Sequence, residues 1–144
     1  MTNEAAPIPL ERAAYPVWVE ERLRFADTDM FGHVNHAAIV TLFEIGRAGM
    51  GGGSSARHLL PPGSVTAVRV LKVEYLSELR YPGEVAIGMR VGRIGRTSFA
   101  IEQLLLSDKR PVATASLVYV LADPATGTAV PIPDAYRAHL MELA

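Results

Sequence analysis

The sequence predicts a two-layer α+β domain in which an antiparallel five-stranded sheet wraps around one central apolar helix. Residues 36–50 favour a helix yet have hardly any polar face. The stretch from residue 64 to 123 holds four long strand-like segments, and their connections are too short for crossovers. The sheet needs a cover for one face and the helix needs an enclosure, so packing them together satisfies both. Sheet edges and helix flanks would stay exposed in so small a domain, and we therefore expect at least a dimer.

Length and composition fit one globular domain. The 144 residues are 49% hydrophobic and 20% charged, and we expect an N-terminal arm over residues 1–14 and a single domain over residues 15–144. Lys and Arg total 14 against 15 Asp and Glu, which offers no broad attraction to nucleic acid or an anionic membrane. The absence of cysteine excludes disulfides, thiolate nucleophiles, zinc fingers and iron–sulfur clusters. No signal-peptide pattern opens the chain, and no apolar run approaches the roughly 18 residues of a membrane span, so we expect a cytoplasmic protein.

The N-terminal half is expected to hold one strand and the central helix. Hydrophobic and polar residues alternate from Tyr15 to Phe25, which is typical of a strand. Residues 27–35 are rich in turn formers, and Asn35 is a suitable N-cap for a helix over residues 36–50. Gly51, Gly52 and Gly53 would end that helix, and residues 54–63 would form a flexible loop.

The C-terminal half is expected to supply four strands and a short helix. The strands are predicted near residues 66–79, 84–94, 97–107 and 111–122, and the helix over residues 133–144, with a proline near its start. Alternation puts Val68, Val70, Lys72 and Glu74 on one face of the first of these strands, where a cross-strand ion pair is expected.

One segment concentrates groups that can do chemistry. It lies immediately before the predicted central helix and contains Asp27, Asp29, Gly32, His33, Asn35 and His36. A helix start exposes unpaired backbone N–H groups and the positive end of the helix dipole, and both favour an oxyanion. A carboxylate held there could act as base or nucleophile on a carbonyl whose oxygen those amides stabilise.

Other interpretations of this segment stay open. A calcium loop fails because apolar residues occupy its fifth and twelfth positions. His33 and His36 with the two aspartates are potential ligands for a transition metal, but they follow no known metal-binding spacing, and we expect no metal. An ordinary turn, with Asp27 as a cap and Asp29 solvated, needs no chemistry at all. For the two histidines, the simpler role is to fix the loop through hydrogen bonds. For Asn35, the simpler role is to cap the helix.

The predicted central helix carries a carboxylate at Glu44, three residues before Arg47. Burial would raise the pKa of Glu44 and make it a second acid–base group. An ion pair with Arg47, one turn away, is the simpler account.

The first strand, the segment RFADTDMFGHVNH and the helix ending FEIGR resemble the 4-hydroxybenzoyl-CoA thioesterase-like branch of the hotdog-fold acyl-CoA thioesterases. The resemblance covers roughly residues 15–136 in the order and spacing of elements. Its most specific part is the D-x-D-x-x-G motif that leads into a helix with an E-x-x-R ending. It implies the hotdog fold, a homodimer joined by sheet edges and often doubled to a homotetramer, and active sites at the subunit boundary.

The resemblance also implies roles for single residues. Asp29 matches the family's catalytic carboxylate, and the backbone N–H of His36 matches the group that polarises the thioester carbonyl. Asp27 matches the supporting aspartate, and Gly32 the glycine that lets the substrate approach the backbone. Three further residues are expected to support this site: His33, Asn35 and Glu44.

A second part of the implied site is the turn formed by Arg96, Thr97 and Ser98, which resembles the family's turn along the pantetheine arm or the phosphates. The chain also departs from the family pattern. Many relatives have Asn or Tyr where His36 stands, and an aromatic residue where Ile39 stands. These departures touch the acyl pocket and bear on the identity of the substrate more than on the type of reaction.

These patterns lead to the hypothesis that the protein hydrolyses an acyl-CoA thioester to a free acid and CoA. Asp29 would attack the carbonyl or deprotonate a water that does so. No cofactor is expected, because a thioester is already an activated carbonyl. Two alternatives stay open, an acyl-CoA hydratase on the same fold and a non-catalytic acyl-CoA or acyl-carrier binding module.

Overall fold

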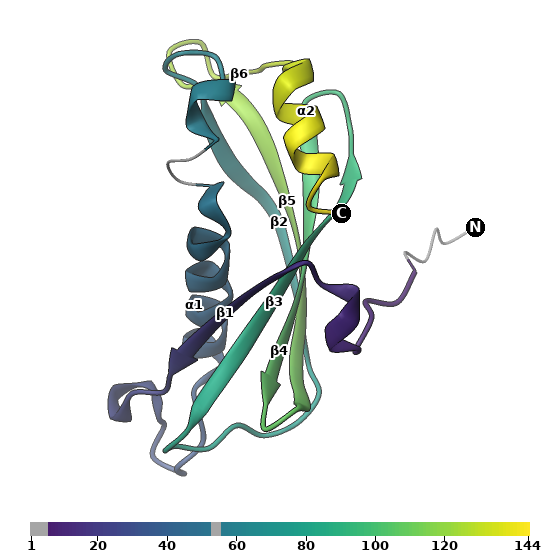
Figure 1. The fold of residues 1–144 in the computed structure, drawn as a ribbon. Helices are drawn as coiled ribbons and strands as arrows, with labels where there is room; N and C mark the ends of the chain where they lie inside the picture. The colour runs from purple at the N-terminus through teal and green to yellow at the C-terminus, as the bar shows by residue number, and fades with distance from the viewer. Residues whose placement is uncertain (1–5, 53–55) are drawn as a thin grey trace, which may run out of the picture.

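The computed structural model describes residues 6–52 and 56–144. Its sheet is antiparallel throughout, with the strand order β1-β3-β4-β5-β2, and α1 runs along one face of this curled sheet (Figure 1). The predicted α+β architecture is therefore confirmed. The strands are β1 (Val17–Arg22), β2 (Val65–Tyr75), β3 (Glu84–Ile94), β4 (Ser98–Ser107) and β5 (Arg110–Asp123), and the helices are α1 (His36–Arg47) and α2 (Asp134–Met141). A two-residue strand, β6 (Thr128–Ala129), pairs with β5 and was not predicted.

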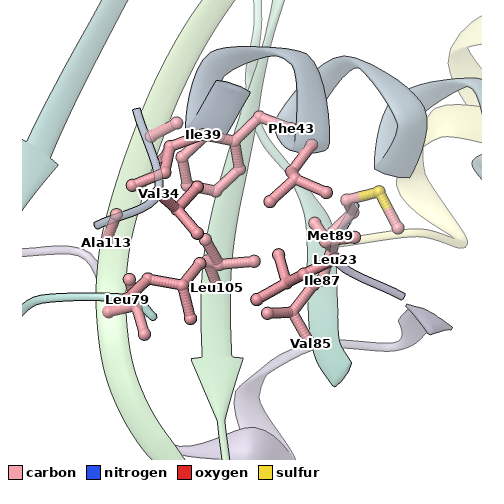
Figure 2. Close-up of a cluster of buried hydrophobic side chains, with 13 residues drawn as sticks. Leu23, Val34, Ile39, Phe43, Leu79, Val85, Ile87, Met89, Leu105 and Ala113 are labelled. Carbon is pink, nitrogen blue, oxygen red and sulfur yellow. The ribbon is translucent and has the colours of Figure 1, made fainter. Parts of the chain in front are cut away.

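Helix α1 begins where the sequence predicts. The side chain of Asn35 accepts a hydrogen bond from the Ala37 N–H at 2.8 Å, which confirms the N-cap. One face of α1 packs on the sheet, and Figure 2 shows its Ile39 and Phe43 among side chains from β3 and β4. A Cβ on Gly46 would come within 2.6 Å of Ile87 Cγ2, so glycine allows the helix to lie this close to β3.

Four elements end before their predicted last residue, and one of them is α2, which ends at Met141 and not at residue 144. β1 ends at Arg22, because the chain turns into a short 3₁₀ helix over Phe25–Asp27. α1 ends at Arg47 and gives way to a π-helical turn over Ala48–Gly52. β2 ends at Tyr75, because the next two amides both donate to the carbonyl of Val112. Gly53 and residues 54–55 of the predicted loop lie outside the described residues.

The other end of the sheet has its own core. Helix α2 contributes Tyr136 and Leu140 to a cluster that also contains Phe99 and Ile101 from β4. On the opposite side of the sheet, Ile8 and Ala14 of the N-terminal segment pack against a small cluster around Tyr15. The Tyr15 hydroxyl donates to the Pro9 carbonyl at 2.7 Å. Burial raises the pKa of Tyr15 to about 12.

Strand β2 contains a bulge at Arg69. The register passes from Val68 opposite Tyr119 to Val70 opposite Val118, and the bulge puts Val68 and Val70 on different faces of the sheet. The expectation that these two residues share a face is therefore wrong. The expected ion pair forms along the strand and not across strands, between Lys72 Nζ and Glu74 Oε1 at 3.2 Å.

Much of β2 and one flank of α1 are exposed in a single chain. β2 stands at the end of the strand order, and its Val65, Val68, Val70, Leu71 and Tyr75 are all exposed. The exposed flank of α1 contains Ala37, Thr41 and Glu44, so the enclosure predicted for this helix is only partial in one chain. No helix in the described part of the chain is long and apolar enough to cross a membrane.

Candidate active site

The loop between β1 and α1 is held by backbone hydrogen bonds. Thr28 and Val34 form an isolated antiparallel bridge, and the Asp29 N–H donates to the His33 carbonyl at 2.8 Å. Gly32 has a φ of 78°, a left-handed conformation in which a side chain would be strained. The turn-rich composition thus gives a folded-back loop with Asp29 at its start.

The Asp29 carboxylate is partly buried and has one oxygen engaged. Its Oδ1 accepts hydrogen bonds from the backbone N–H groups of Phe31, at 2.8 Å, and His33, at 3.1 Å. Its Oδ2 has no hydrogen-bond partner among residues 6–52 and 56–144. The side chain therefore stabilises its own turn and still has one oxygen free for chemistry.

Asp27 holds the loop to the strand before it and to the helix after it. Its side chain, only 6% exposed, accepts from the Arg24 backbone N–H at 2.9 Å and from Arg24 Nη2 at 2.8 Å. Its carbonyl accepts from the Asn35 N–H at 2.8 Å. The Arg24 side-chain hydrogen bonds lower the pKa of Asp27, against the opposing effect of burial. Asp27 is thus engaged in local structure.

The first turn of α1 presents a free donor. In the described part of the chain the His36 N–H has no acceptor, as is usual for the first amides of a helix. The His36 ring packs on the Tyr75 ring with centroids 4.7 Å apart, and the Tyr75 hydroxyl donates to the His36 carbonyl at 3.3 Å. Met30 and Phe31 of the neighbouring loop are largely exposed. An oxyanion placed at this helix start would meet an unpaired donor and the positive end of the dipole.

His33 is held by neighbouring side chains. Its Nε2 lies 2.8 Å from Arg80 Nη2 and 3.3 Å from Glu78 Oε2, and its backbone bridges to Arg80. These contacts tie the loop to the segment that leads into β3. They agree with the simpler role expected for this histidine, which is to fix the loop.

Glu44 and Arg47 do not form the predicted ion pair. Arg47 instead donates from Nε to the Tyr119 hydroxyl at 3.0 Å and from Nη1 to Gln103 Oε1 at 2.8 Å. The fully buried Gln103 in turn donates from Nε2 to the Phe43 carbonyl at 2.8 Å. Glu44 lies on the exposed flank of α1. Sequence reasoning missed this network, and its one visible signal was a glutamine among the apolar residues of β4.

A cavity of about 250 Å³ lies between the C-terminal half of α1, β2, β4, β5 and α2. Its apolar walls include Phe99, Ile101 and Leu140, and its polar lining includes Arg47 and Glu44. Tyr136, whose pKa is raised by burial, and His139 complete the polar lining on the α2 side. This cavity was not predicted from the sequence.

The turn of Arg96, Thr97 and Ser98 lies far from Asp29 in one chain. The Asp29 loop contacts the chain just before β3, whereas this turn follows the last residue of β3 (Figure 1). The 11 residues of β3 separate the two by about 35 Å. The turn is closed by the Gly95 N–H donating to the Ser98 carbonyl at 2.7 Å, and Arg137 donates to Gly95 O at 2.8 Å. Within one chain the two parts of the expected site do not meet.

Metal ligands do not gather in the described residues. Among them, no three His, Asp or Glu side chains come close enough together to hold a metal ion. At His33, the ring nitrogen Nε2 is already in contact with the guanidinium of Arg80, a cation, and with the carboxylate of Glu78.

The chain was compared with known proteins. No curated protein matches it. A thioesterase superfamily protein from Jannaschia sp. CCS1 is 28% identical, with a TM-score of 0.78 over 90% of this chain and 83% of that one. A predicted thioesterase from Bacillus stearothermophilus is 27% identical, with a TM-score of 0.77 over 88% of this chain and 95% of that one.

A third similar structure is a thioesterase from Thermus thermophilus in complex with coenzyme A and Zn. It is 28% identical, with a TM-score of 0.74 over 90% of this chain and 94% of that one. The family model of the thioesterase-like superfamily matches residues 23–140, from the end of β1 to the end of α2. The chain therefore has the hotdog fold and belongs to the thioesterase-like superfamily.

Proposed function

We propose that this protein is an acyl-CoA thioesterase that uses Asp29 and the first amide of α1. The observation that carries the proposal is the pairing of a half-engaged carboxylate with an unpaired helix-start donor in one loop–helix unit. Asp29 has one oxygen fixed by loop amides and the other without a partner among the described residues. The His36 N–H likewise has no acceptor there. The coenzyme A bound by the similar T. thermophilus thioesterase supports CoA as the thiol part of the substrate.

In the proposed reaction the thioester carbonyl oxygen accepts a hydrogen bond from the His36 N–H. Asp29 either attacks the carbonyl carbon, giving an anhydride that water then hydrolyses, or removes a proton from a water that attacks directly. On both routes the carbon–sulfur bond breaks, the thiolate of CoA takes up a proton, and the water oxygen ends in the carboxylic acid. The helix dipole stabilises the developing negative charge on the carbonyl oxygen.

The supporting residues have structural tasks in this proposal. Asp27 and His33 hold the loop in place through Arg24, Arg80 and Glu78. Asn35 caps the helix that supplies the donor. The zinc ion of the T. thermophilus protein is not carried over, because the described residues of this chain bring together no group of three metal ligands.

We also propose a homodimer formed through β2. In the described residues no strand pairs with the outer side of the 11-residue strand β2, and its Val70, Leu71 and Tyr75 are exposed. Proteins usually cover such an edge. A second copy that pairs antiparallel with β2 would continue the sheet and lie beside the exposed flank of α1. It would also bring the Arg96–Ser98 turn of one chain toward the Asp29 loop of the other, since the paired strands run in opposite directions.

The test is release of free thiol from a panel of short, branched, long and aromatic acyl-CoA esters. Asp29→Asn keeps an oxygen for the loop amides but removes the base or nucleophile, so turnover should fall by about 10²- to 10⁴-fold while the melting temperature is kept. Asp108→Asn is the matched control, because Asp108 is exposed on the β4–β5 turn with a φ of 49°, which asparagine tolerates.

Two other outcomes would replace this proposal. Hydration of enoyl-CoA esters, followed by absorbance, without thiol release would indicate a hydratase. Tight binding of acyl-CoA esters in calorimetry without turnover of any ester would indicate a binding module. Full activity of Asp29→Asn would remove Asp29 from the reaction.

A further inference from the structure

The guanidinium of Arg47 is a half-buried cation that has no acidic partner in the part of the chain that the structure describes. Within the described residues two of its five N–H donors are used, and both donate to neutral groups, the Tyr119 hydroxyl and the Gln103 side chain. Among residues 6–52 and 56–144 it forms no ion pair, although Glu44 lines the same cavity. A cation withdrawn from water without a counter-charge is unfavourable, and a carboxylate that reached it would remove that penalty.

The donors left on Arg47 suit a carboxylate in particular. A guanidinium binds a carboxylate through two parallel N–H···O bonds, which fix its orientation as well as its charge. The Tyr119 and Gln103 hydrogen bonds hold the guanidinium plane in place, so a ligand would meet a positioned group. Glu44 also lines the cavity, but it lies on the exposed flank of α1, where water and salt screen its charge.

The remaining walls of the cavity suit a hydrocarbon chain. Phe99, Ile101 and Leu140 are all buried in the apolar cluster beneath α2, and Phe99 stacks on Tyr119 with ring centroids 5.5 Å apart. The cavity holds about 250 Å³. A hydrophobic cavity of about 150 Å³ is enough for benzene, so this one accepts a short chain of several carbons with a polar end.

The proposed dimer brings this cavity to a reaction centre. In one chain, Arg47 follows the helix start by 11 residues, which is about 16 Å along α1. Pairing two β2 strands antiparallel about their middle residue, Val70, with Arg69 bulged out of the ladder, places Tyr75 of one chain within one residue of Val65 of the partner subunit. Tyr75 packs on His36 at the helix start, and Thr66, next to Val65, lines the cavity. The cavity of one chain would thus open beside the helix start of the other.

From these observations we propose that the cavity beside Arg47 receives the acyl group of the substrate, and that this acyl group ends in a carboxylate. The substrate class is then the CoA monothioesters of medium-length dicarboxylic acids. The free carboxylate pairs with Arg47, and the thioester lies at the helix start of the partner subunit. This inference rests on the proposed thioesterase function and on the β2 dimer.

The test compares two esters of equal chain length, adipoyl-CoA with a terminal carboxylate and hexanoyl-CoA with a terminal methyl group. We expect the wild-type kcat/KM to favour adipoyl-CoA by at least ~10-fold, because the methyl end leaves the Arg47 cation unpaired. Arg47→Met should abolish or reverse this ratio, and Arg47→Lys should keep part of it. Arg22→Met is the matched control, because Arg22 is exposed on β1 and pairs only with Glu84 on the surface.

The outcomes separate this inference from the proposed function. Equal or faster hydrolysis of hexanoyl-CoA by the wild type overturns the inference and leaves the thioesterase intact. An adipoyl preference that survives in folded Arg47→Met overturns it as well. If no ester is hydrolysed, the proposed function fails. The cavity assignment is then tested by calorimetry, which compares the binding of the two esters to the wild type. Tighter binding of adipoyl-CoA would support the cavity assignment, and equal binding would overturn it. If Arg47→Met does not fold, the ratio of kcat/KM for adipoyl-CoA to that for hexanoyl-CoA in the wild type still tests the inference.

Discussion

Replacing Gln103 by methionine tests the buried network that joins α1 to the sheet. Gln103 is fully buried and bonds in two directions, accepting from Arg47 Nη1 and donating to the Phe43 carbonyl, each at 2.8 Å. Methionine fills a similar volume but can make neither hydrogen bond. Gln103→Met therefore leaves a guanidinium N–H without its acceptor and removes one bond from a helix carbonyl.

The expected loss of stability can be worked from these two bonds. A hydrogen bond to a charged donor contributes about 1.5–3 kcal/mol, and a neutral one about 0.5–1.5 kcal/mol. Burying a more apolar side chain offsets part of this, so we expect a loss of about 2–4 kcal/mol. A domain of this size has a free energy of unfolding of only about 5–15 kcal/mol, so the change is large.

The measurement is urea unfolding followed by circular dichroism at one fixed protein concentration, because a dimer's stability depends on concentration. Arg47→Met and the double variant complete a thermodynamic cycle. If the two side chains act through their mutual hydrogen bond, the double variant should cost at least about 0.5–1 kcal/mol less than the two single losses together. A loss below about 1 kcal/mol for Gln103→Met, or strictly additive losses, would refute the reasoning.

Three further predictions concern the site and the subunit contact. Asn35→Ala should lower the stability by about 1 kcal/mol in urea unfolding, and Asn35→Asp should not, because an aspartate also caps the helix; equal losses would speak against capping. The pKa of Asp27 is lowered in the folded chain, so its carboxylate stabilises the protein above about pH 4, and this contribution is lost as the pH falls toward the lowered value. Asp27→Asn should therefore lower the urea midpoint at pH 7 and flatten its decline below pH ~4, and an unchanged acid decline would contradict this. Val70→Lys places a charge at the middle of the β2 edge and should give a monomer in light scattering coupled to gel filtration, with loss of turnover; a persistent dimer would move the interface elsewhere.

The fold was predictable because its signals are local. The cap at Asn35 and the apolar composition of residues 36–47 are written in neighbouring residues, and so is the alternation of β3 and β4. Element ends were less accurate, because they depend on distant partners. β2 stops at Tyr75 because the carbonyl of Val112, far along the chain, captures the next amides.

The site was predictable only in its loop. The turn before α1 is visible as a short motif, and its hydrogen bonds join residues close in sequence, such as Asp29 to His33. The sequence predicted an ion pair between Arg47 and its helix neighbour Glu44, whereas the hydrogen-bond partners of Arg47 come from β4 and β5. Helical spacing shows which side chains are near one another on a helix, but not which sheet residues offer better acceptors. The cavity could not be foreseen, since it needs five elements to enclose it.

Arg69 is the extra residue of the bulge in β2, and it has no partner in the register with β5. Val68 and Val70 pair with consecutive residues of β5. A chain lacking Arg69 would therefore form an unbroken ladder, and all the remaining side chains of β2 would stay on their present faces. Thr66 would still line the cavity, and Val70 would still point to the opposite side. A one-residue deletion at this point would thus leave both the lining of the cavity and the proposed subunit contact unchanged, so a difference in chain length here would not by itself change the substrate.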